Sequence, residues 1–288
     1  MTAACPACGE ALQTGLREWH RVCAGCGYEG STLAPHILEQ ADGGDLDEAA
    51  RAQGLAQLRN ANFQRLLDWM CRSLPLPGGR PRLLDVGCAH GWFIERAAAQ
   101  FETVGIEPDS AVANATRARG LAVRGGFFPD ALNADERFDV IVFNDVLEHI
   151  PDVNAVLAAC WQHLQPGGWV IVNAPSRRGF LYRLSKVLAR LGRGGAFERM
   201  WQLGFPSPHV HYFDTANLRL LAHKAGFSVD GRTRLASMTV HGLYARIRYS
   251  REVPAFKALV LTLALGAMAP LLAVLPADIE VWSLRRPP

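Results

Sequence analysis

The sequence predicts an α/β protein, with a doubly wound, mostly parallel β-sheet between two layers of helices and a small cysteine-rich domain in front of it. Three observations support this fold class. Short apolar runs alternate with helical patterns over most of the chain, which is typical of a parallel sheet covered on both faces. One run ends in a glycine turn that opens a helix, at residues 83–93 (LLDVGCAHGWF). Two Cys-x-x-Cys pairs stand close to the N-terminus.

Length and charge limit the function classes. A chain of 288 residues allows one large domain and one small domain. The formal net charge of +3 is mild and does not by itself indicate nucleic-acid binding. Residues 1–8 (MTAACPAC) lack the basic and apolar regions of a secretory signal, which predicts a cytoplasmic protein. No glycine–lysine pair occurs, which excludes a P-loop NTPase.

The first element is the cysteine cluster. Cys5-x-x-Cys8 and Cys23-x-x-Cys26 are separated by fourteen residues. Two such pairs offer four thiolates to a tetrahedral zinc ion, and four protein ligands leave the metal only a structural role. The alternatives are disulfides or a redox motif, which a reducing cytosol and the lack of a surrounding βαβ pattern disfavour. We therefore predict a zinc ribbon over residues 1–34.

A helical linker comes next. Residues 46–74 have apolar side chains at helical spacing, and Pro75 and Pro77 end the pattern. We expect residues 35–80 to pack on the large domain, residues 81–288.

The segment 83–93 then predicts a ligand site. A strand, a tight glycine turn and a helix allow a nucleotide-like ligand to approach bare backbone. Glu107 ends a second apolar run twenty residues after Gly87, where a carboxylate can accept hydrogen bonds from ribose hydroxyls. A dinucleotide fingerprint would need a small residue where Trp92 stands. The pattern present is D-x-G-x-x-x-G, from Asp85 to Gly91.

The remaining elements complete the expected sheet. We predict helices over 110–119 and 215–225, and strands over 121–124, 138–143 (FDVIVF) and 168–174 (GWVIVNA). In such a sheet the ligand lies at the carboxyl ends of the strands, where Asp85, Glu107, Asn144 and Asp145 fall.

These segments together resemble the class I S-adenosylmethionine (SAM)-dependent methyltransferases. Residues 85–91 resemble their first motif, and 137–152 (RFDVIVFNDVLEHIPD) their fourth strand and turn. Residues 164–176 resemble their fifth strand with its Pro-Gly-Gly lead-in. Residues 209–227 (HVHYFDTANLRLLAHKAGF) resemble a His- and Phe-containing segment and helix of a subgroup with an N-terminal zinc ribbon. The resemblance covers about residues 1–235. It implies a Rossmann-like sheet of seven strands whose last, antiparallel strand we place at 279–284.

The resemblance also implies cofactor contacts. They comprise the turn around the methionine part, the ribose-binding acid Glu107, the residues beside the adenine, and the wall that faces the sulfonium. The implied set is Asp85, Gly87, Cys88, Ala89, Gly91, Glu107, Pro108, Asp109, Gly126, Phe127, Asn144 and Asp145. Ala89 stands where the family often has a further glycine.

Candidates for catalysis follow the fourth strand. SAM carries the electrophilic methyl group, so the protein mainly aligns a nucleophile and excludes water. A hydroxyl nucleophile also loses a proton, and Asp145 with His149, His209 or His211 could remove it. Alternatively, Asp145, Glu148 and His149 hold a divalent cation with one of the later histidines, as in some methyltransferases for catechol-like quinone precursors and RNA ends. In metal-free relatives the same Glu and His only hold the turn.

Two segments predict contact with the inner face of a membrane. Residues 177–199 contain seven basic side chains against one acid, with apolar side chains at helical spacing. The alternative is a solvated lid. Residues 258–277 carry no charge but are interrupted by Gly266, Pro270 and Pro276. We expect two short apolar helices there, capping the substrate site or lying in the membrane interface, rather than a buried or a spanning segment.

We therefore expect a SAM-dependent methyltransferase that acts on oxygen of a small or amphiphilic acceptor, such as a lipid-linked glycan or a quinone-like lipid. The inserts 177–208 and 236–277 would form the acceptor site. The alternatives are an RNA or protein methyltransferase guided by the ribbon, or a non-catalytic module with the SAM fold. Nucleic acid is disfavoured because the ribbon has only Arg17 and Arg21 as basic side chains.

Overall fold

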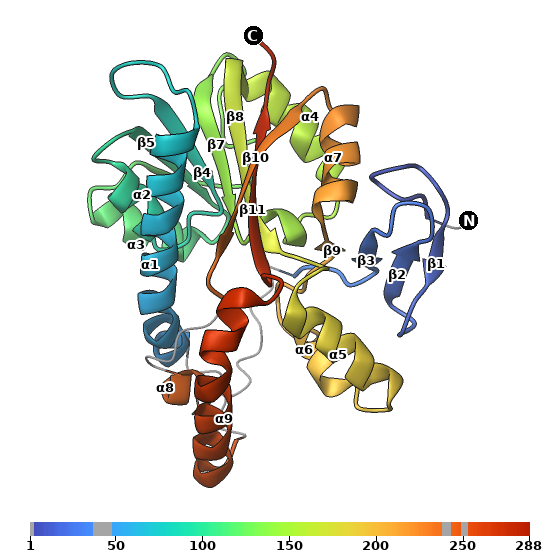
Figure 1. The fold of residues 1–288 in the computed structure, drawn as a ribbon. Helices are drawn as coiled ribbons and strands as arrows, with labels where there is room; N and C mark the ends of the chain where they lie inside the picture. Colours follow the sequence, from blue (N-terminus) through green and yellow to red (C-terminus); the bar gives the residue numbers. More distant parts are fainter. Residues whose placement is uncertain (1–2, 37–47, 238–242, 249–252) are drawn as a thin grey trace.

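The computed structural model describes residues 3–36, 48–237, 243–248 and 253–288 (Figure 1). Its centre is a seven-stranded sheet in the order β10-β11-β8-β7-β4-β5-β6. Strand β11 is antiparallel to both neighbours, and all other adjacent pairs are parallel. The strands are β4 (Arg82–Val86), β5 (Glu102–Glu107), β6 (Val123–Gly125), β7 (Phe138–Asn144), β8 (Leu164–Pro175), β10 (Ser228–Leu235) and β11 (Ile279–Arg285). The predicted doubly wound sheet is confirmed.

Helices cover both faces of this sheet. One face carries α1 (Glu48–Ser73) and α2 (Trp92–Ala97), and the other carries α4 (Val153–His163) and α7 (Thr215–Lys224) (Figure 1). The short helix α3 (Ser110–Ala118) packs beside β5 and β6. Aspartates begin three of these helices: the carboxylates of Asp109, Asp152 and Asp214 accept hydrogen bonds from backbone N–H groups of the first turn.

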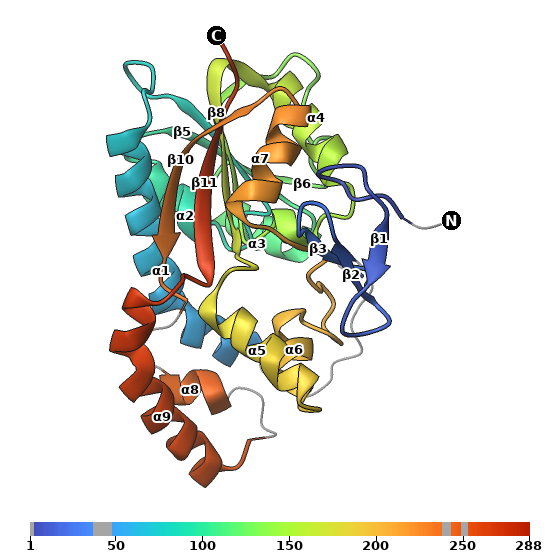
Figure 2. The same ribbon diagram turned by 45° about the vertical axis from the view of Figure 1, so that its right-hand side comes forward.

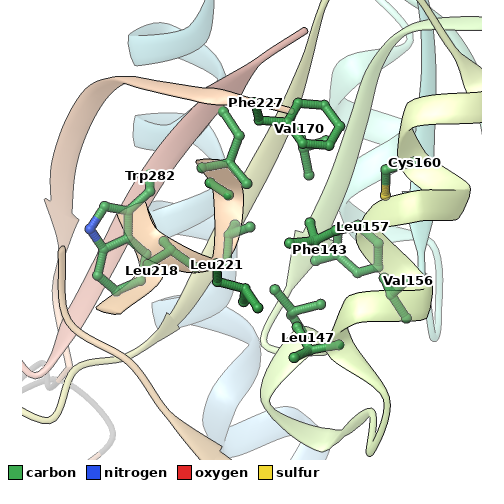
Figure 3. Packing of buried hydrophobic residues seen from close by; sticks show 14 of the residues in the cluster. Phe143, Leu147, Val156, Leu157, Cys160, Val170, Leu218, Leu221, Phe227 and Trp282 are labelled. Atoms are coloured by element: carbon green, nitrogen blue, oxygen red, sulfur yellow. The ribbon is translucent and has the colours of Figure 1, made fainter. Parts of the chain in front are cut away.

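The apolar strands divide their side chains between the two layers because successive residues of a strand point to opposite faces. In β7, Ile141 and Phe143 belong to the core beneath α4 and α7, whereas Val140 and Val142 belong to the core beneath α1 and α2. Figure 3 shows the first of these cores, where Leu157 of α4 and Leu221 of α7 converge on the sheet. A strand buried on both faces accounts for the unbroken apolar run of the sequence.

The cysteine-rich domain forms a second, small sheet in the order β1-β2-β3-β9. Its strands are β1 (Leu12–Thr14), β2 (His20–Cys23), β3 (Glu29–Ser31) and β9 (His211–Tyr212). All three strand pairs are antiparallel. Strand β9 comes from the large domain, with Tyr212 opposite Glu29, so the ribbon is joined to that domain through backbone hydrogen bonds.

Four further helices lie beyond the carboxyl edge of the parallel strands: α5 (Phe180–Arg190), α6 (Gly195–Met200), α8 (Leu243–Arg248) and α9 (Ala255–Val274) (Figure 2). The prediction of two short helices over 258–277 is wrong, because α9 is one continuous helix. A break would leave about eight backbone N–H and C=O groups without helical partners. The free-energy cost of this loss exceeds the cost of one glycine and one proline inside the helix. Of the helices that the structure describes, none is long and apolar enough to cross a membrane.

Candidate active site

The glycine turn after β4 has the conformation that its sequence requires. Gly87 and Gly91 have φ angles of 70° and 73°. A Cβ atom on Gly87 would lie 2.7 Å from a methyl group of Val146, and one on Gly91 would lie 2.7 Å from Leu121. Ala89 also has a positive φ, 45°, which explains why glycine is the common residue there. The turn therefore exposes backbone at the carboxyl end of β4.

Glu107 holds this turn from the neighbouring strand. One oxygen of its carboxylate accepts from the backbone N–H of Ala89 at 2.8 Å, and the other accepts from Asp109 at 2.9 Å. Burial raises the pKa of Glu107, although these two N–H groups oppose the shift. Each carboxylate oxygen keeps a further lone pair, so the side chain can order the turn and still accept from a ligand hydroxyl.

Asp85 and Asn144 form a second pair, at the ends of β4 and β7. The Asn144 amide donates to the Asp85 carboxylate at 3.3 Å. Burial raises the pKa of Asp85 to about 8, because only this one hydrogen bond offsets the loss of water and Glu107 adds negative charge. A cationic ligand beside Asp85 would favour the ionised carboxylate.

The other predicted cofactor residues lie along the same edge of four adjacent strands. Asp109 begins α3, and Pro108 precedes it. Gly126, whose N–H donates to the Glu107 carbonyl, follows β6, and the neighbouring Phe127 is exposed. Cys88 is buried against Gly105, which gives it a packing role within the turn. The structure thus brings the predicted cofactor residues to one edge.

The turn after β7 carries the catalytic candidates. Asp145 has a φ of 55°, and its N–H donates to the carbonyl of Asn173 on β8. Glu148 and His149 follow in a 3-10 turn, η1 (Leu147–His149). The side chains of Glu148, His149 and His209 approach one another, with their potential ligand atoms all within 4.8 Å. Among the described residues Asp145 lies outside this group, although its charge acts on Glu148.

Burial shifts every pKa in this group toward the uncharged form. It raises the pKa of Glu148 well above its ordinary value, with the charge of Asp145 adding to the effect. It lowers the pKa of His149, and it lowers that of His209 to about 3. Both imidazoles are therefore neutral at neutral pH, and each ring keeps one nitrogen with a lone pair.

His211 occupies a different position. One ring nitrogen contacts the hydroxyl of Tyr28 in the ribbon, and the other lies 2.8 Å from the carbonyl of Ile150. Both nitrogens are thus occupied, and the ring supports the chain after η1. Sequence reasoning missed Gln202, whose side-chain nitrogen lies 2.8 Å from Nε2 of His209. Gln202 lies in the insert 177–208, which contains no recognisable sequence motif.

The four cysteines of the ribbon also converge. Their sulfur atoms lie within 4.8 Å of one another, with Cys5 and Cys26 3.6 Å apart and Cys8 and Cys23 3.3 Å apart. Both distances are far longer than a disulfide bond. Tetrahedral zinc–thiolate bonds of about 2.3 Å place neighbouring sulfurs roughly 3.8 Å apart, so the cluster is compatible with a zinc ribbon.

A family model described as a methyltransferase domain matches residues 51–230, more than half of the chain. The chain belongs to this family. A relative in Thiobacillus denitrificans, named ubiquinone biosynthesis O-methyltransferase, is 28% identical over 190 residues, which cover 62% of this chain and 75% of the relative. A protein of the same name in Cereibacter sphaeroides is 38% identical over 135 residues, 44% of this chain and 52% of the relative. The chain thus spans about half the length of the second relative.

Solved methyltransferase structures share the fold. A methyltransferase in complex with the Trm112 methyltransferase activator of Haloferax volcanii matches with a TM-score of 0.56 at 15% identity, over 84% of this chain and 95% of that one. Magnesium protoporphyrin IX methyltransferase from Synechocystis matches with a TM-score of 0.52 at 13% identity, over 81% and 86%. The predicted SAM-dependent methyltransferase is confirmed.

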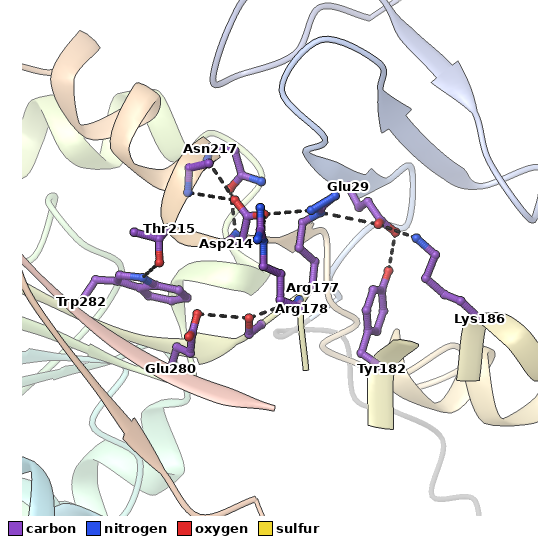
Figure 4. A network of polar contacts seen from close by, with 12 residues as sticks. Glu29, Arg177, Arg178, Tyr182, Lys186, Asp214, Thr215, Asn217, Glu280 and Trp282 are labelled. Carbon is purple, nitrogen blue, oxygen red and sulfur yellow. Dashed lines mark hydrogen bonds and ion pairs between the residues drawn. The ribbon is translucent and has the colours of Figure 1, made fainter. Parts of the chain in front are cut away.

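The ribbon of this methyltransferase docks through a buried carboxylate (Figure 4). Glu29 on β3 accepts from the Tyr182 hydroxyl at 2.7 Å and from the Lys186 ammonium at 2.5 Å, both on α5. His20 on β2 contacts it at 3.0 Å. Burial alone would raise the pKa of Glu29, but His20 and Lys186 outweigh burial and hold it at about 2. Glu29 therefore joins the ribbon to the helix that follows β8.

A second network continues from this junction into the sheet. Arg177 and Arg178 both pair with the Asp214 carboxylate at 2.8 Å, and Arg177 also approaches Glu29 at 3.7 Å. Ser176 donates to Glu280 on β11 at 3.2 Å (Figure 4). Ion pairs thus fasten the segment between β8 and α5 to the ribbon and to the start of α7, and a hydrogen bond fastens it to β11.

Proposed function

We propose that the methyltransferase transfers the methyl group of SAM to an oxygen atom of a small, lipid-like acceptor, such as a quinone-like lipid or a lipid-linked glycan. The observation that carries this proposal is the cluster of Glu148, His149 and His209 beside the β7 edge, in which Glu148 and His209 are buried and His149 is half-buried. A hydroxyl acceptor releases a proton during methylation, and neutral imidazoles shielded from water can receive it. Relatives named ubiquinone biosynthesis O-methyltransferase support an acceptor of this chemistry.

SAM would lie along the edge formed by β4, β5, β6 and β7. When bound, it supplies the electrophilic methyl group. Asp85 would face the cationic part of the cofactor, and its burial fits a group that becomes ionised beside a positive charge. Glu107 would accept from the ribose hydroxyls, as the lone pairs left by its two backbone contacts allow. The backbone around Gly87 and Gly91 would approach the methionine part.

Calorimetry of SAM binding tests this assignment. Glu107→Gln should weaken binding at least about tenfold, because a charge-assisted hydrogen bond contributes about 1.5–3 kcal/mol. Glu102→Gln, at the opposite end of the same strand, is the matched control and should leave the affinity unchanged. Equal affinities of the wild type and the Glu107 variant would remove Glu107 from the cofactor site. Turnover of a catechol but not of an amine of similar size would support an oxygen acceptor.

We also propose that Cys5, Cys8, Cys23 and Cys26 hold a structural zinc ion. The sulfur positions support it, and four protein ligands would leave no position open for chemistry. The ribbon would then contribute to folding and to docking on α5. One equivalent of zinc in the purified protein, lost in Cys8→Ser, is the expected result, and a metal-free preparation with intact fold would contradict the assignment.

A second proposal concerns the inner face of a membrane. The structure leaves Leu184 and Val187 of α5 exposed, together with Leu191 directly after it, beside the exposed Arg183 and Arg190. Helix α9 lies at the same end of the molecule as α5 (Figure 2). It exposes further apolar side chains, namely Phe256, Leu259, Val260 and Leu263. Apolar side chains next to arginines match a surface of anionic lipids, which accepts both.

Vesicle flotation tests the membrane proposal. With vesicles of phosphatidylcholine and phosphatidylglycerol, the double variant Val187→Glu, Leu191→Glu should bind at least about tenfold more weakly than the wild type. Leu220→Glu is the control, because Leu220 is equally apolar and 45% exposed but lies on α7, away from this end. Equal losses in both variants, or no binding of the wild type, would overturn the proposal.

A further inference from the structure

A cavity of about 310 Å³ lies between α5, α6 and the sheet. Its floor is formed where β8 ends and β11 begins, at Pro175 and Ile279. Apolar and aromatic side chains make up much of the wall, among them Leu181, Met200 and Phe205. Tyr182 and Tyr212 also line it, and their rings stack with centroids 4.1 Å apart. The cavity therefore has flat apolar walls at the carboxyl edge of the sheet.

This cavity adjoins the proposed cofactor edge. Asn144 at the end of β7 is paired with Asn173 on β8, two residues before the cavity floor. Adjacent strands are about 4.8 Å apart, so the floor lies one strand away from the wall that would face the sulfonium. His209 belongs both to the cavity lining and to the cluster with Glu148 and His149. The cavity and the cluster thus meet at His209, which lines the cavity, whereas Glu148 and His149 are not among the lining residues.

The lining indicates a neutral, planar ligand. The volume is at the low end of ligand pockets, which accommodates one substituted ring rather than a long chain. Among the described residues, one basic side chain, Arg199, and one carboxylate, Asp278, line the cavity, so their formal charges balance. The Asp278 carboxylate accepts from the N–H groups of Leu181 and Tyr182. A hydroxylated aromatic ring fits both the apolar walls and the polar side chains of Gln202 and His209.

The hydrogen bonds of the two histidines assign their tautomers. Nδ1 of His149 lies 2.9 Å from the carbonyl of Pro208, which only accepts, so Nδ1 carries the hydrogen and Nε2 presents a lone pair. Nε2 of His209 lies 2.8 Å from the amide nitrogen of Gln202, which only donates, so Nδ1 of His209 carries the hydrogen. That Nδ1 is buried and makes no well-aligned hydrogen bond in the described structure, although the Met200 carbonyl lies close enough to the ring to oppose the lowering of its pKa.

We propose that the cavity binds the methyl acceptor as a hydroxylated aromatic ring, with Nδ1–H of His209 donating to the acceptor oxygen and Nε2 of His149 taking its proton. This inference rests on the proposed function and names the acceptor site within it. The lone pair of the acceptor oxygen forms the new bond to carbon, the bond between sulfur and the methyl group breaks, and sulfur keeps the electron pair. The hydroxyl proton passes to His149 as the oxygen attacks.

The first test fills the cavity. Met200→Trp should weaken binding of 4-methylcatechol to the protein saturated with S-adenosylhomocysteine at least about tenfold in calorimetry, and should leave SAM affinity unchanged. Leu203→Trp is the control, because Leu203 follows α6 but does not line the cavity. Equal ring affinity in the two variants would overturn the cavity assignment. If the wild type does not bind SAM, the proposed function is contradicted instead. Failure of the cavity assignment and failure of the proposed function are therefore distinguishable.

The second test separates the two histidines. His149→Gln should lower kcat for 4-methylcatechol at least about 100-fold and remove the acidic limb of the pH–rate profile, while ring binding persists. His209→Gln should mainly raise KM, because Gln keeps a donor but not its position. A normal pH–rate profile in His149→Gln would overturn the base assignment. Activity lost with EDTA and restored by Mg²⁺ would overturn it too, since a metal would need the lone pairs of both rings.

Discussion

Glu29→Gln tests whether the ribbon is fastened to α5 by one buried charge. The pKa of Glu29 is about 2 instead of 4.5. Each tenfold change in acid dissociation corresponds to about 1.4 kcal/mol, so the ionised carboxylate stabilises the fold by about 3 kcal/mol. The glutamine variant keeps the shape but leaves Lys186 and His20 facing a neutral amide. We expect it to lose about 2–4 kcal/mol in urea denaturation at pH 7.

The stability lost in Glu29→Gln should also depend on pH. A carboxyl group whose folded pKa is depressed stabilises the protein above its unfolded pKa and loses that contribution as pH falls through the folded value. The difference in unfolding free energy between wild type and Glu29→Gln should therefore be constant from pH 7 to about pH 5. It should shrink as the pH falls from about 4.5 toward 2.

A matched control is available on the same junction. Arg17 and Glu198 also join the ribbon to the large domain, at 2.9 Å, but their side chains are 31% and 36% exposed. Glu198→Gln should cost less than about 1 kcal/mol, because water screens the pair. Equal losses for the two variants, or a Glu29→Gln loss that does not change with pH, would refute the argument that burial makes Glu29 the stronger link.

Three other predictions concern the turn, the core and the ribbon. Gly87→Ala should cost about 1–3 kcal/mol in urea denaturation and weaken SAM binding in calorimetry, because φ is 70° and the new Cβ would meet Val146; unchanged SAM affinity would contradict this. Leu221→Ala should cost about 2–5 kcal/mol and its exposed neighbour Leu220→Ala less than about 0.5, so equal losses would contradict the core assignment (Figure 3). Removal of metal by a chelator should speed hydrogen exchange in β1–β3 but not in β4 and β7, whereas protection unchanged throughout would contradict a metal-held ribbon.

The sheet could be predicted because its signals are local. An apolar strand such as 138–143 is readable from its own residues, since both of its faces are buried and no partner needs to be known. The turn from Asp85 to Gly91 is readable because positive φ and close approach demand glycine. Resemblance to a known family then placed the strands in order, including the antiparallel strand before the C-terminus.

The inserts could be predicted only in part, because their structure depends on distant partners. The apolar spacing of 180–191 correctly indicated a helix, yet α5 buries Tyr182, Ser185 and Ala189 and exposes Leu184 and Val187. Tyr182 is buried because Glu29, 153 residues away in the chain, accepts its hydroxyl. No pattern within the insert encodes that contact. The pairing of β9 with the ribbon is equally remote, and it was missed for the same reason.

Two tyrosines connect the ribbon with the acceptor cavity, and they give the ribbon a role in substrate binding. Tyr182 donates to Glu29 of β3 and also lines the cavity beneath α5. Tyr212 stacks on Tyr182 within the same wall and is paired with Glu29 through the β3–β9 register. Loosening the ribbon would therefore displace both tyrosines, while the turn at Gly87 is held by β5 and Glu107. We accordingly expect ribbon variants to raise the acceptor KM before they affect SAM affinity.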